Sequence, residues 1–174
     1  KHGGSRNAGF LAAVLEFIKL RAALRPSEGL QVIQGNFRRF SEESDAWYLE
    51  VKDNGFERSH VKKLKKWGQR RVPLDPLACR FLSRFFSPEG FTWEEHNIKW
   101  EYNSPMLCFP RARCSTGNKL LSIQAHNQTI GKAKREFAKM CGDPALLMLS
   151  GHSMRRTAVH MFEKNRVPPS QGMK

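Results

Sequence analysis

His152 and Arg155 stand three residues apart at the start of a segment with helical spacing. Residues at this separation lie on one face of a helix, one above the other. An imidazole that can accept a proton, beside a guanidinium that stays charged, suits chemistry on a phosphate group. A histidine at a helix start is more often a cap or a satisfied polar group. The pair therefore supports a phosphate site only if other cations lie close to it in the fold.

Arg25 is a second candidate cation, because the segments around it constrain its position. Residues 8–24 carry apolar side chains at helical spacing, namely Phe10, Leu11, Val14, Leu15 and Ile18. Pro26 should end this helix, since the residue before a proline avoids the α region. Pro26 can also open a new short helix, with Glu28 in its favourable first turn. Arg25 would then stand in the corner between two helices, although taken alone it would be read as a surface or capping arginine.

Lysines supply further cations in a basic stretch, residues 58–71, which contains no acidic residue. Such a run is usually a solvated face or a disordered tail. Here apolar residues interrupt the run and Val72-Pro73-Leu74 follows it, so we expect a folded hairpin. Alternating residues and turn signals at Asp53-Asn54-Gly55 and Trp67-Gly68-Gln69 predict a small antiparallel sheet. Its expected strands are residues 46–52, 58–66 and 70–74.

Helices account for much of the remaining chain. Asp75 and Pro76 make a good N-cap and first position for a helix through Phe86. Its inward side chains are predicted to be Leu77, Phe81, Leu82 and Phe85. Two further helices are expected, one over residues 123–141 that is closed by Gly142 and one over residues 152–165.

The segments between these helices differ in character. Residues 87–106 are aromatic, acidic and rich in turn signals, which predicts a surface insertion. Residues 106–110 are predicted to form a short buried segment. Residues 111–119 are predicted to form a basic loop.

Composition restricts the class of protein. The chain has 174 residues, 40% of them hydrophobic, which predicts one domain with a substantial core. Lys and Arg number 30 against 16 Asp and Glu, and the net charge of +14 favours binding to polyanions. No apolar run in the sequence is long enough to span a bilayer, so we expect no membrane partner.

The four cysteines lack the dense spacing of a disulfide framework, which predicts a reducing intracellular compartment. A zinc site made from Cys108, Cys114 and His126 would lack the close cysteine pair that is typical of such sites. We therefore expect no metal ion.

Taken in order, these features resemble the catalytic domain of the tyrosine recombinases, also called phage integrases. Four motifs carry the resemblance: Ala23-Leu24-Arg25-Pro26-Ser27-Glu28, Lys65 through Val72-Pro73-Leu74, Leu107-Cys108-Phe109-Pro110 and His152-Ser153-Met154-Arg155-Arg156-Thr157. Each motif is weak alone, but the set in this order is specific and covers nearly the whole chain. The resemblance implies an α+β fold, mainly helical, with helices around a small three-stranded antiparallel sheet. Residues 1–174 would form a single catalytic domain.

The resemblance also implies a reaction: DNA strand cleavage and rejoining, for site-specific recombination or integration of a mobile element. A tyrosine attacks a DNA phosphodiester, giving a 3′-phosphotyrosine and a free 5′-hydroxyl without a metal or other cofactor. Arg25 and Arg155 would bind the phosphate oxygens as two bidentate forks. Lys65 would be the general acid that protonates the leaving oxygen. His152 would accept the tyrosine proton or act as a positioning donor.

The choice of Lys65 depends on its spacing to Val72-Pro73, and its lysine neighbours stay open as alternatives for the general acid. The remaining cations are expected to contact backbone phosphates, which position a protein without specifying a sequence. These expected DNA-binding residues are Lys62, Lys63, Lys66, Arg70, Arg71 and Arg156.

The nucleophilic tyrosine is not expected within these residues. Tyr48 belongs to a predicted strand and Tyr102 to the aromatic insertion, so neither follows the His-x-x-Arg helix. The family's N-terminal core-binding domain is missing too. We therefore expect an inactive, C-terminally truncated fragment that is monomeric and binds DNA weakly. The full-length protein is expected to act as a homotetramer on double-stranded DNA, in the nucleus or nucleoid.

Two other functions remain open at this point. A non-catalytic basic DNA-binding module could keep the fold without the chemistry. A type IB topoisomerase-like enzyme would place comparable cations around a tyrosine, although the hairpin and Arg-Pro-Ser-Glu look more like the recombinases. A Gly-His or Gly-Trp followed closely by a tyrosine, encoded after Lys174, would favour an enzyme over the binding module.

Overall fold

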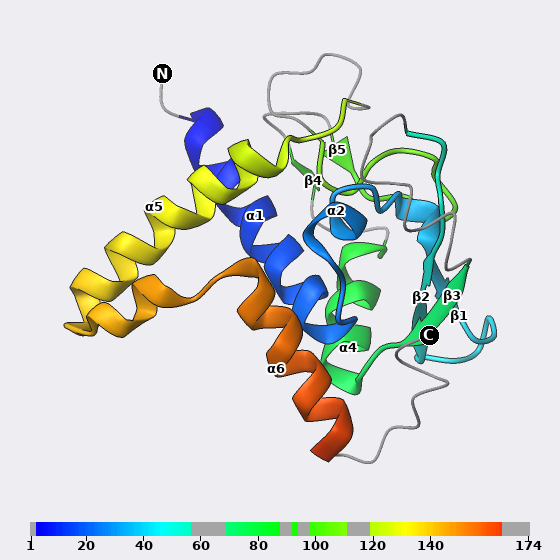
Figure 1. Cartoon of the computed structure of the whole chain (residues 1–174). Helices are drawn as coiled ribbons and strands as arrows, with labels where there is room; N and C mark the ends of the chain where they lie inside the picture. Colours follow the sequence, from blue (N-terminus) through cyan, green and yellow to red (C-terminus); the bar gives the residue numbers. More distant parts are fainter. Residues whose placement is uncertain (1–2, 57–68, 88–91, 94–97, 111–118, 165–174) are drawn as a thin grey trace.

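The computed structural model describes residues 3–56, 69–87, 92–93, 98–110 and 119–164 (Figure 1). Helix α1 (Gly3–Arg21) runs through the middle, and α5 (Ile123–Cys141) and α6 (Gly151–Lys164) pack against it. Helix α4 (Pro76–Phe85) and a three-stranded sheet lie to the right of α1 in Figure 1. This arrangement confirms a mixed helical and sheet fold that contains a small antiparallel sheet.

Helix α1 buries the apolar stripe that the sequence predicts. Three of the five stripe residues are buried and two partly buried: Val14, Leu15 and Ile18, then Phe10 and Leu11. The stripe repeats every three to four residues, so one side of the helix faces the core. Lys19 is an exception to the pattern, because its side chain is only 1% exposed and pairs with Glu16 at 2.6 Å.

The corner after α1 is formed by backbone geometry. The helix ends at Arg21, earlier than the predicted end at residue 24, because Ala23 has a φ of 49° in the left-handed region. The Leu24 N–H donates to the Lys19 carbonyl instead of continuing the helix. The short helix α2 (Pro26–Gly29) then begins at Pro26, as predicted. Arg25 therefore stands in the corner between two helices.

The sheet has the strand order β1-β2-β3 and is antiparallel throughout. Its strands are β1 (Phe37–Arg39), which follows the 3₁₀ turn η1 (Gln34–Asn36), then β2 (Trp47–Val51) and β3 (Arg70–Pro73). The strands predicted at 46–52 and 70–74 are confirmed, and the one predicted at 58–66 lies outside the described residues. The remaining strand of the observed sheet is β1, which is too short to show an alternating pattern.

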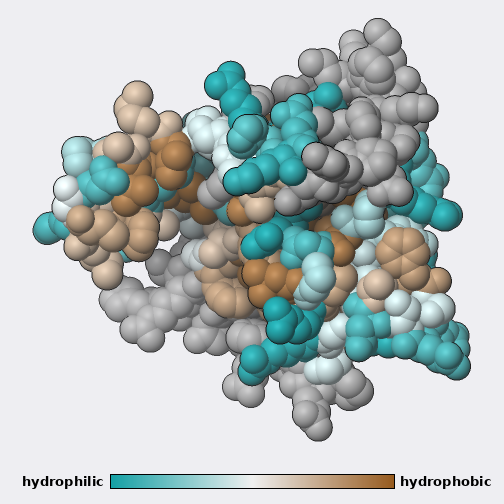
Figure 2. Space-filling model, turned by 90° about the horizontal axis from the view of Figure 1, so that it is seen from below, coloured by the Kyte–Doolittle hydropathy of each residue, from teal (hydrophilic) through white to brown (hydrophobic). Residues whose placement is uncertain are grey.

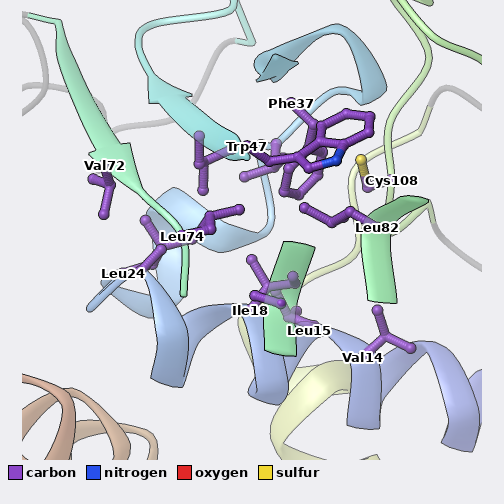
Figure 3. Packing of buried hydrophobic residues seen from close by; sticks show 14 of the residues in the cluster. Val14, Leu15, Ile18, Leu24, Phe37, Trp47, Val72, Leu74, Leu82 and Cys108 are labelled. Carbon is purple, nitrogen blue, oxygen red and sulfur yellow. The ribbon is translucent and has the colours of Figure 1, made fainter. Parts of the chain in front are cut away.

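One face of the sheet supplies part of the core. Leu49 pairs with Phe37 on one side and Val72 on the other, and all three are buried. Figure 3 shows Phe37 and Trp47 on the side of Leu82 of α4, and Val72 on the side of Leu24 and Leu74. Because side chains alternate along a strand, the residues next to these in sequence point to the outer face.

Helix α4 is capped as predicted, and its buried face differs from the predicted one mainly at Leu77. The Asp75 carboxylate accepts hydrogen bonds from the backbone N–H groups of Leu77 and Ala78. The prediction that Leu77 points inward is wrong, since its side chain is 46% exposed. The other predicted inward residues do face the core, since Leu82 and Phe85 are buried and Phe81 is partly buried against it. Ala78 and Cys79 are also buried, near the start of the helix.

The predicted surface insertion also contributes to the core. Trp100 follows the short strands β4 (Thr92–Trp93) and β5 (Ile98–Lys99), and it is 1% exposed. Its ring contacts Phe37, Phe85, Phe86 and Phe109. The prediction of a purely surface segment over 87–106 is therefore wrong at this residue. Residues 107–110 are buried, as predicted.

The C-terminal half of α5 forms an arm with the 3₁₀ helix η3 (Pro144–Met148) (Figure 1). Gly142 ends α5 in the left-handed conformation with φ of 66°, as the sequence predicts. The arm and the residue directly after it carry exposed apolar side chains, namely Phe137, Met140, Leu147, Met148 and Leu149. Figure 2 shows hydrophobic surface gathered over this part of the molecule. Among the described helices, none is both long and apolar enough to cross a membrane.

Candidate functional site

Glu28 is the centre of a cluster of arginines. Its side chain is 2% exposed. One carboxylate oxygen, Oε2, accepts a hydrogen bond from the backbone N–H of Arg25 at 2.7 Å. The other, Oε1, accepts from the Arg25 side-chain Nη1 at 2.9 Å. Glu28 therefore ties down both the backbone and the guanidinium of the corner residue.

Arg70 reaches the same carboxylate from strand β3. Its Nη1 donates to Glu28 Oε1 at 3.1 Å and its Nη2 donates to Glu28 Oε2 at 2.9 Å. Two parallel hydrogen bonds of this kind form the bidentate geometry that a guanidinium and a carboxylate favour. The pair joins the sheet to the α1–α2 corner.

Arg155 completes the cluster from helix α6. Its Nη1 lies 3.8 Å from Glu28 Oε2, which allows attraction between the charges but is too long for a hydrogen bond. This nitrogen is buried and has no hydrogen-bond partner among the described residues. Buried donors without a partner are uncommon in folded proteins, so this nitrogen is free to donate a hydrogen bond to a ligand or a water molecule.

Electrostatics in the cluster favour an anion. Three guanidinium groups and one carboxylate leave a formal excess of two positive charges. Burial raises the pKa of Glu28, but the hydrogen bonds and charges of Arg70 and Arg25 outweigh it, so the pKa is lowered overall. Burial lowers the pKa of Arg155, and the charge of Arg25 lowers it further. An anion at Arg155 would relieve this repulsion.

A hollow of about 360 Å³ opens beside Arg155 along α6. Its lining residues are Arg155, Arg156, Val159, His160 and Glu163. These residues follow one face of α6, and of the cluster residues only Arg155 lines the hollow.

The structure brings together two of the four predicted catalytic residues, Arg25 and Arg155, although they are far apart in sequence. His152 lies in the first turn of α6, one turn before Arg155. Lys65 lies outside the described residues, as do Lys62, Lys63 and Lys66. The described part of the hairpin is therefore its C-terminal strand alone.

The other predicted DNA-binding residues have different surroundings. Arg71 is exposed on the outer face of β3, with its guanidinium 5.4 Å from the centre of the Tyr48 ring. Arg156 is exposed on α6. Arg70 instead points inward to Glu28. The alternation of the strand could have predicted this, because a buried Val72 places Arg70 on the inner face.

Tyr48 and Tyr102, which the sequence excludes as nucleophiles, both contact other aromatic residues. Tyr48 lies on the outer face of the sheet against Phe40. Tyr102 is 48% exposed and contacts Trp47 and Phe86 edge-on. The aromatic residues that contact the two tyrosines are not members of the arginine cluster around Glu28.

The residues considered for zinc are described only in part. Cys114 lies outside the described residues, and burial raises the pKa of the Cys108 thiol well above its usual value. His126 contacts the Glu16 carboxylate at 2.6 Å. Within the described ranges, no group of three His, Cys, Asp or Glu side chains could hold a metal ion.

Comparison of the chain with protein-family models, with curated proteins and with solved structures finds no match. The geometry of the arginine cluster is therefore the basis for assigning a function.

Proposed function

We propose that this chain is the catalytic domain of an enzyme that cleaves and rejoins DNA strands through a 3′-phosphotyrosine, with the fold and chemistry of the tyrosine recombinases. The observation that carries the proposal is the buried, unpartnered Nη1 of Arg155 beside Arg25, in a cluster with excess positive charge. The sequence motifs that resemble the family contribute both of these arginines.

The scissile phosphate would lie against Arg155 and Arg25. A phosphodiester carries one negative charge, and nucleophilic attack on phosphorus develops further charge on its oxygens. Fixed guanidinium donors stabilise such charge without reorganising, which is the main requirement of a reaction without a metal. The formal excess of two positive charges matches a transition state more closely than the ground state.

The proton transfers are assigned by position in the sequence and by resemblance. His152, one turn before Arg155 on α6, would accept the proton of the attacking tyrosine. Lys65, expected in the hairpin before β3, would protonate the leaving 5′-oxygen. The bond that forms joins the tyrosine oxygen to phosphorus, and the bond that breaks joins phosphorus to the 5′-oxygen.

The test uses the full-length protein and a nicked suicide DNA substrate, with EDTA present. A covalent protein–DNA adduct is expected, and Arg155→Ala should slow its formation by roughly 100-fold or more, as for loss of one preorganised donor. Arg80→Ala is the control, because Arg80 is an exposed arginine on α4 outside the cluster. An adduct that forms equally fast with Arg155→Ala, or only with a divalent ion, would contradict the proposal. Duplex binding without any adduct would favour a non-catalytic DNA-binding module.

A further inference from the structure

Arg70 differs from the other cations that the sequence assigns to DNA, because its guanidinium is occupied inside the protein. Its side chain is 15% exposed, and both terminal nitrogens donate to Glu28. A cation that already makes two charge-assisted hydrogen bonds is poorly placed to bind a backbone phosphate.

We propose that Arg70 is a positioning residue that occupies Glu28 and thereby leaves the Arg155 guanidinium free to bind the phosphate. This role rests on the proposed function, since it concerns the same phosphate site. It assigns to Arg70 a task that a surface lysine or arginine could not perform.

Glu28 has a limited number of acceptor sites for its arginine neighbours. An ionised carboxylate offers about four lone-pair sites. Glu28 Oε1 accepts from Arg25 Nη1 and Arg70 Nη1, and Oε2 accepts from the Arg25 backbone N–H and Arg70 Nη2. All four sites are therefore filled, and Arg155 stays at 3.8 Å without a hydrogen bond.

Removal of Arg70 would open two of these sites. Arg155 Nη1 is close enough to move onto Glu28, and a buried, unpartnered donor gains a strong charge-assisted bond by doing so. Glu28 would then neutralise the charge of Arg155, which would no longer be free to bind phosphate. The loss of phosphate affinity would come from Glu28 capturing Arg155 as well as from the lost positive charge.

Phosphate binding by the 174-residue chain tests this idea, with inorganic phosphate as the probe. The signal is the side-chain Nε–H resonance of Arg155 in a ¹⁵N-labelled sample, followed during titration. Arg70→Gln should raise the dissociation constant by about tenfold or more, the effect of losing one hydrogen bond to a charged group. Adding Glu28→Gln to Arg70→Gln should restore most of the affinity, because Arg155 then has no carboxylate to pair with.

The matched control is Glu50→Gln in the Arg70→Gln background. Glu50 is also a mostly buried glutamate, paired with Lys52 at 2.8 Å, and its removal changes the net charge by the same amount. It should not restore binding. Equal rescue by Glu50→Gln and Glu28→Gln would show that Arg70 supplies charge alone, and failure of Glu28→Gln to rescue would show that Arg70 contacts phosphate directly. Either result overturns the positioning role.

Arg70→Lys keeps the test valid if Arg70→Gln does not fold. Lysine retains the charge but donates as a point rather than a fork, so it should leave one acceptor open and weaken phosphate binding. Glu28→Gln should again restore affinity in this background, and unchanged affinity in Arg70→Lys would contradict the inference.

If phosphate leaves the Arg155 resonance unmoved in the unmodified chain, the phosphate site of the proposed function fails. If phosphate binds there but Arg70 variants have no effect, the positioning role alone fails.

Discussion

Arg155 Nη1 lies 3.8 Å from Glu28 Oε2, near enough to feel its charge and too far to form a hydrogen bond. The two residues lie on α6 and α2, at opposite ends of the chain. The distance leaves a buried guanidinium nitrogen unpaired in a cluster of like charges. A buried, unpaired charge of this kind costs stability in the free protein, and a bound anion would offset that cost.

Removing the central carboxylate should destabilise the protein. Glu28→Gln leaves three guanidinium groups with no compensating charge, and breaking a buried ion pair in this way costs about 3 kcal/mol. Urea unfolding measures the change. In the Arg70→Gln background the same substitution should cost clearly less, because the two side chains share one interaction. Additive losses would show that the Glu28–Arg70 pair is energetically unimportant.

Stability should fall in acid because of Glu28 and Glu16. Burial raises both pKa values, but hydrogen bonds from Arg70 to Glu28, and from His126 and Lys19 to Glu16, lower them below the ordinary 4.5. A carboxyl group with a lowered folded pKa contributes stability that is fully present above its unfolded pKa. That stability is lost as the pH falls through the folded pKa. Thermal unfolding from pH 7 to pH 3 measures the loss, and Glu28→Gln should flatten the profile. A profile that is equally steep in this variant would assign the effect to other groups.

His126 should stabilise the contact between α5 and α1. It is 1% exposed and bonds Glu16 across the two helices. His126→Ala removes this bond and leaves a cavity, so we expect a loss of roughly 2–3 kcal/mol in the free energy of unfolding. His160→Ala is the control, since His160 is exposed on α6 and should change stability by less than about 0.5 kcal/mol. Similar effects of both substitutions would argue against a structural role for His126.

Two glycines should respond oppositely to alanine. A Cβ at Gly142 or at Gly9 would meet nothing within 4 Å, so neither site is limited by space. Gly142 has a φ of 66°, and Gly142→Ala should therefore destabilise the protein by about 1 kcal/mol. Gly9 lies within α1, where Gly9→Ala should stabilise by about 0.5–1 kcal/mol. Thermal unfolding distinguishes the signs, and destabilisation by Gly9→Ala would contradict the helical geometry there.

Arg156 should contribute to DNA binding by contacting the phosphate backbone of the DNA. If its exposed guanidinium contacts one phosphate, Arg156→Gln should lower the slope of log affinity against log salt concentration by about 0.9. Fluorescence anisotropy with a short duplex measures this slope. Arg70→Gln should change the slope less, because Arg70 is already occupied by Glu28. A larger change in this slope for Arg70→Gln than for Arg156→Gln would indicate that Arg70 contacts DNA directly.

Local sequence signals predict the ends of several elements correctly. Asp75-Pro76 starts α4 and Gly142 ends α5 where the sequence places them, because caps and left-handed glycines act within one turn of the chain. The corner at Arg25 follows from Pro26 for the same reason. By contrast, the sequence gives no sign that Ala23 takes the left-handed conformation that ends α1.

Local sequence signals did not predict which distant segments contact each other. Leu77 has the spacing of a buried residue and is exposed, whereas Trp100 belongs to an aromatic, acidic segment predicted to lie at the surface and is buried. Which side of α4 faces inward depends on the sheet and on α1, and Trp100 fills a space that four phenylalanines surround. Burial of this kind is set by the shapes of neighbouring elements.

The sequence by itself determined the cation types, the capped helices and the candidate residues Arg25 and Arg155, because these depend on short-range spacing. Only the tertiary structure decided that Arg25, Arg70 and Arg155 surround one carboxylate, and that Arg70 fills its last acceptor sites while Arg155 stays 3.8 Å away. The physical reason is that the type of a side chain sets its charge and its hydrogen-bonding groups. Its charge partners depend on which segments pack together in space.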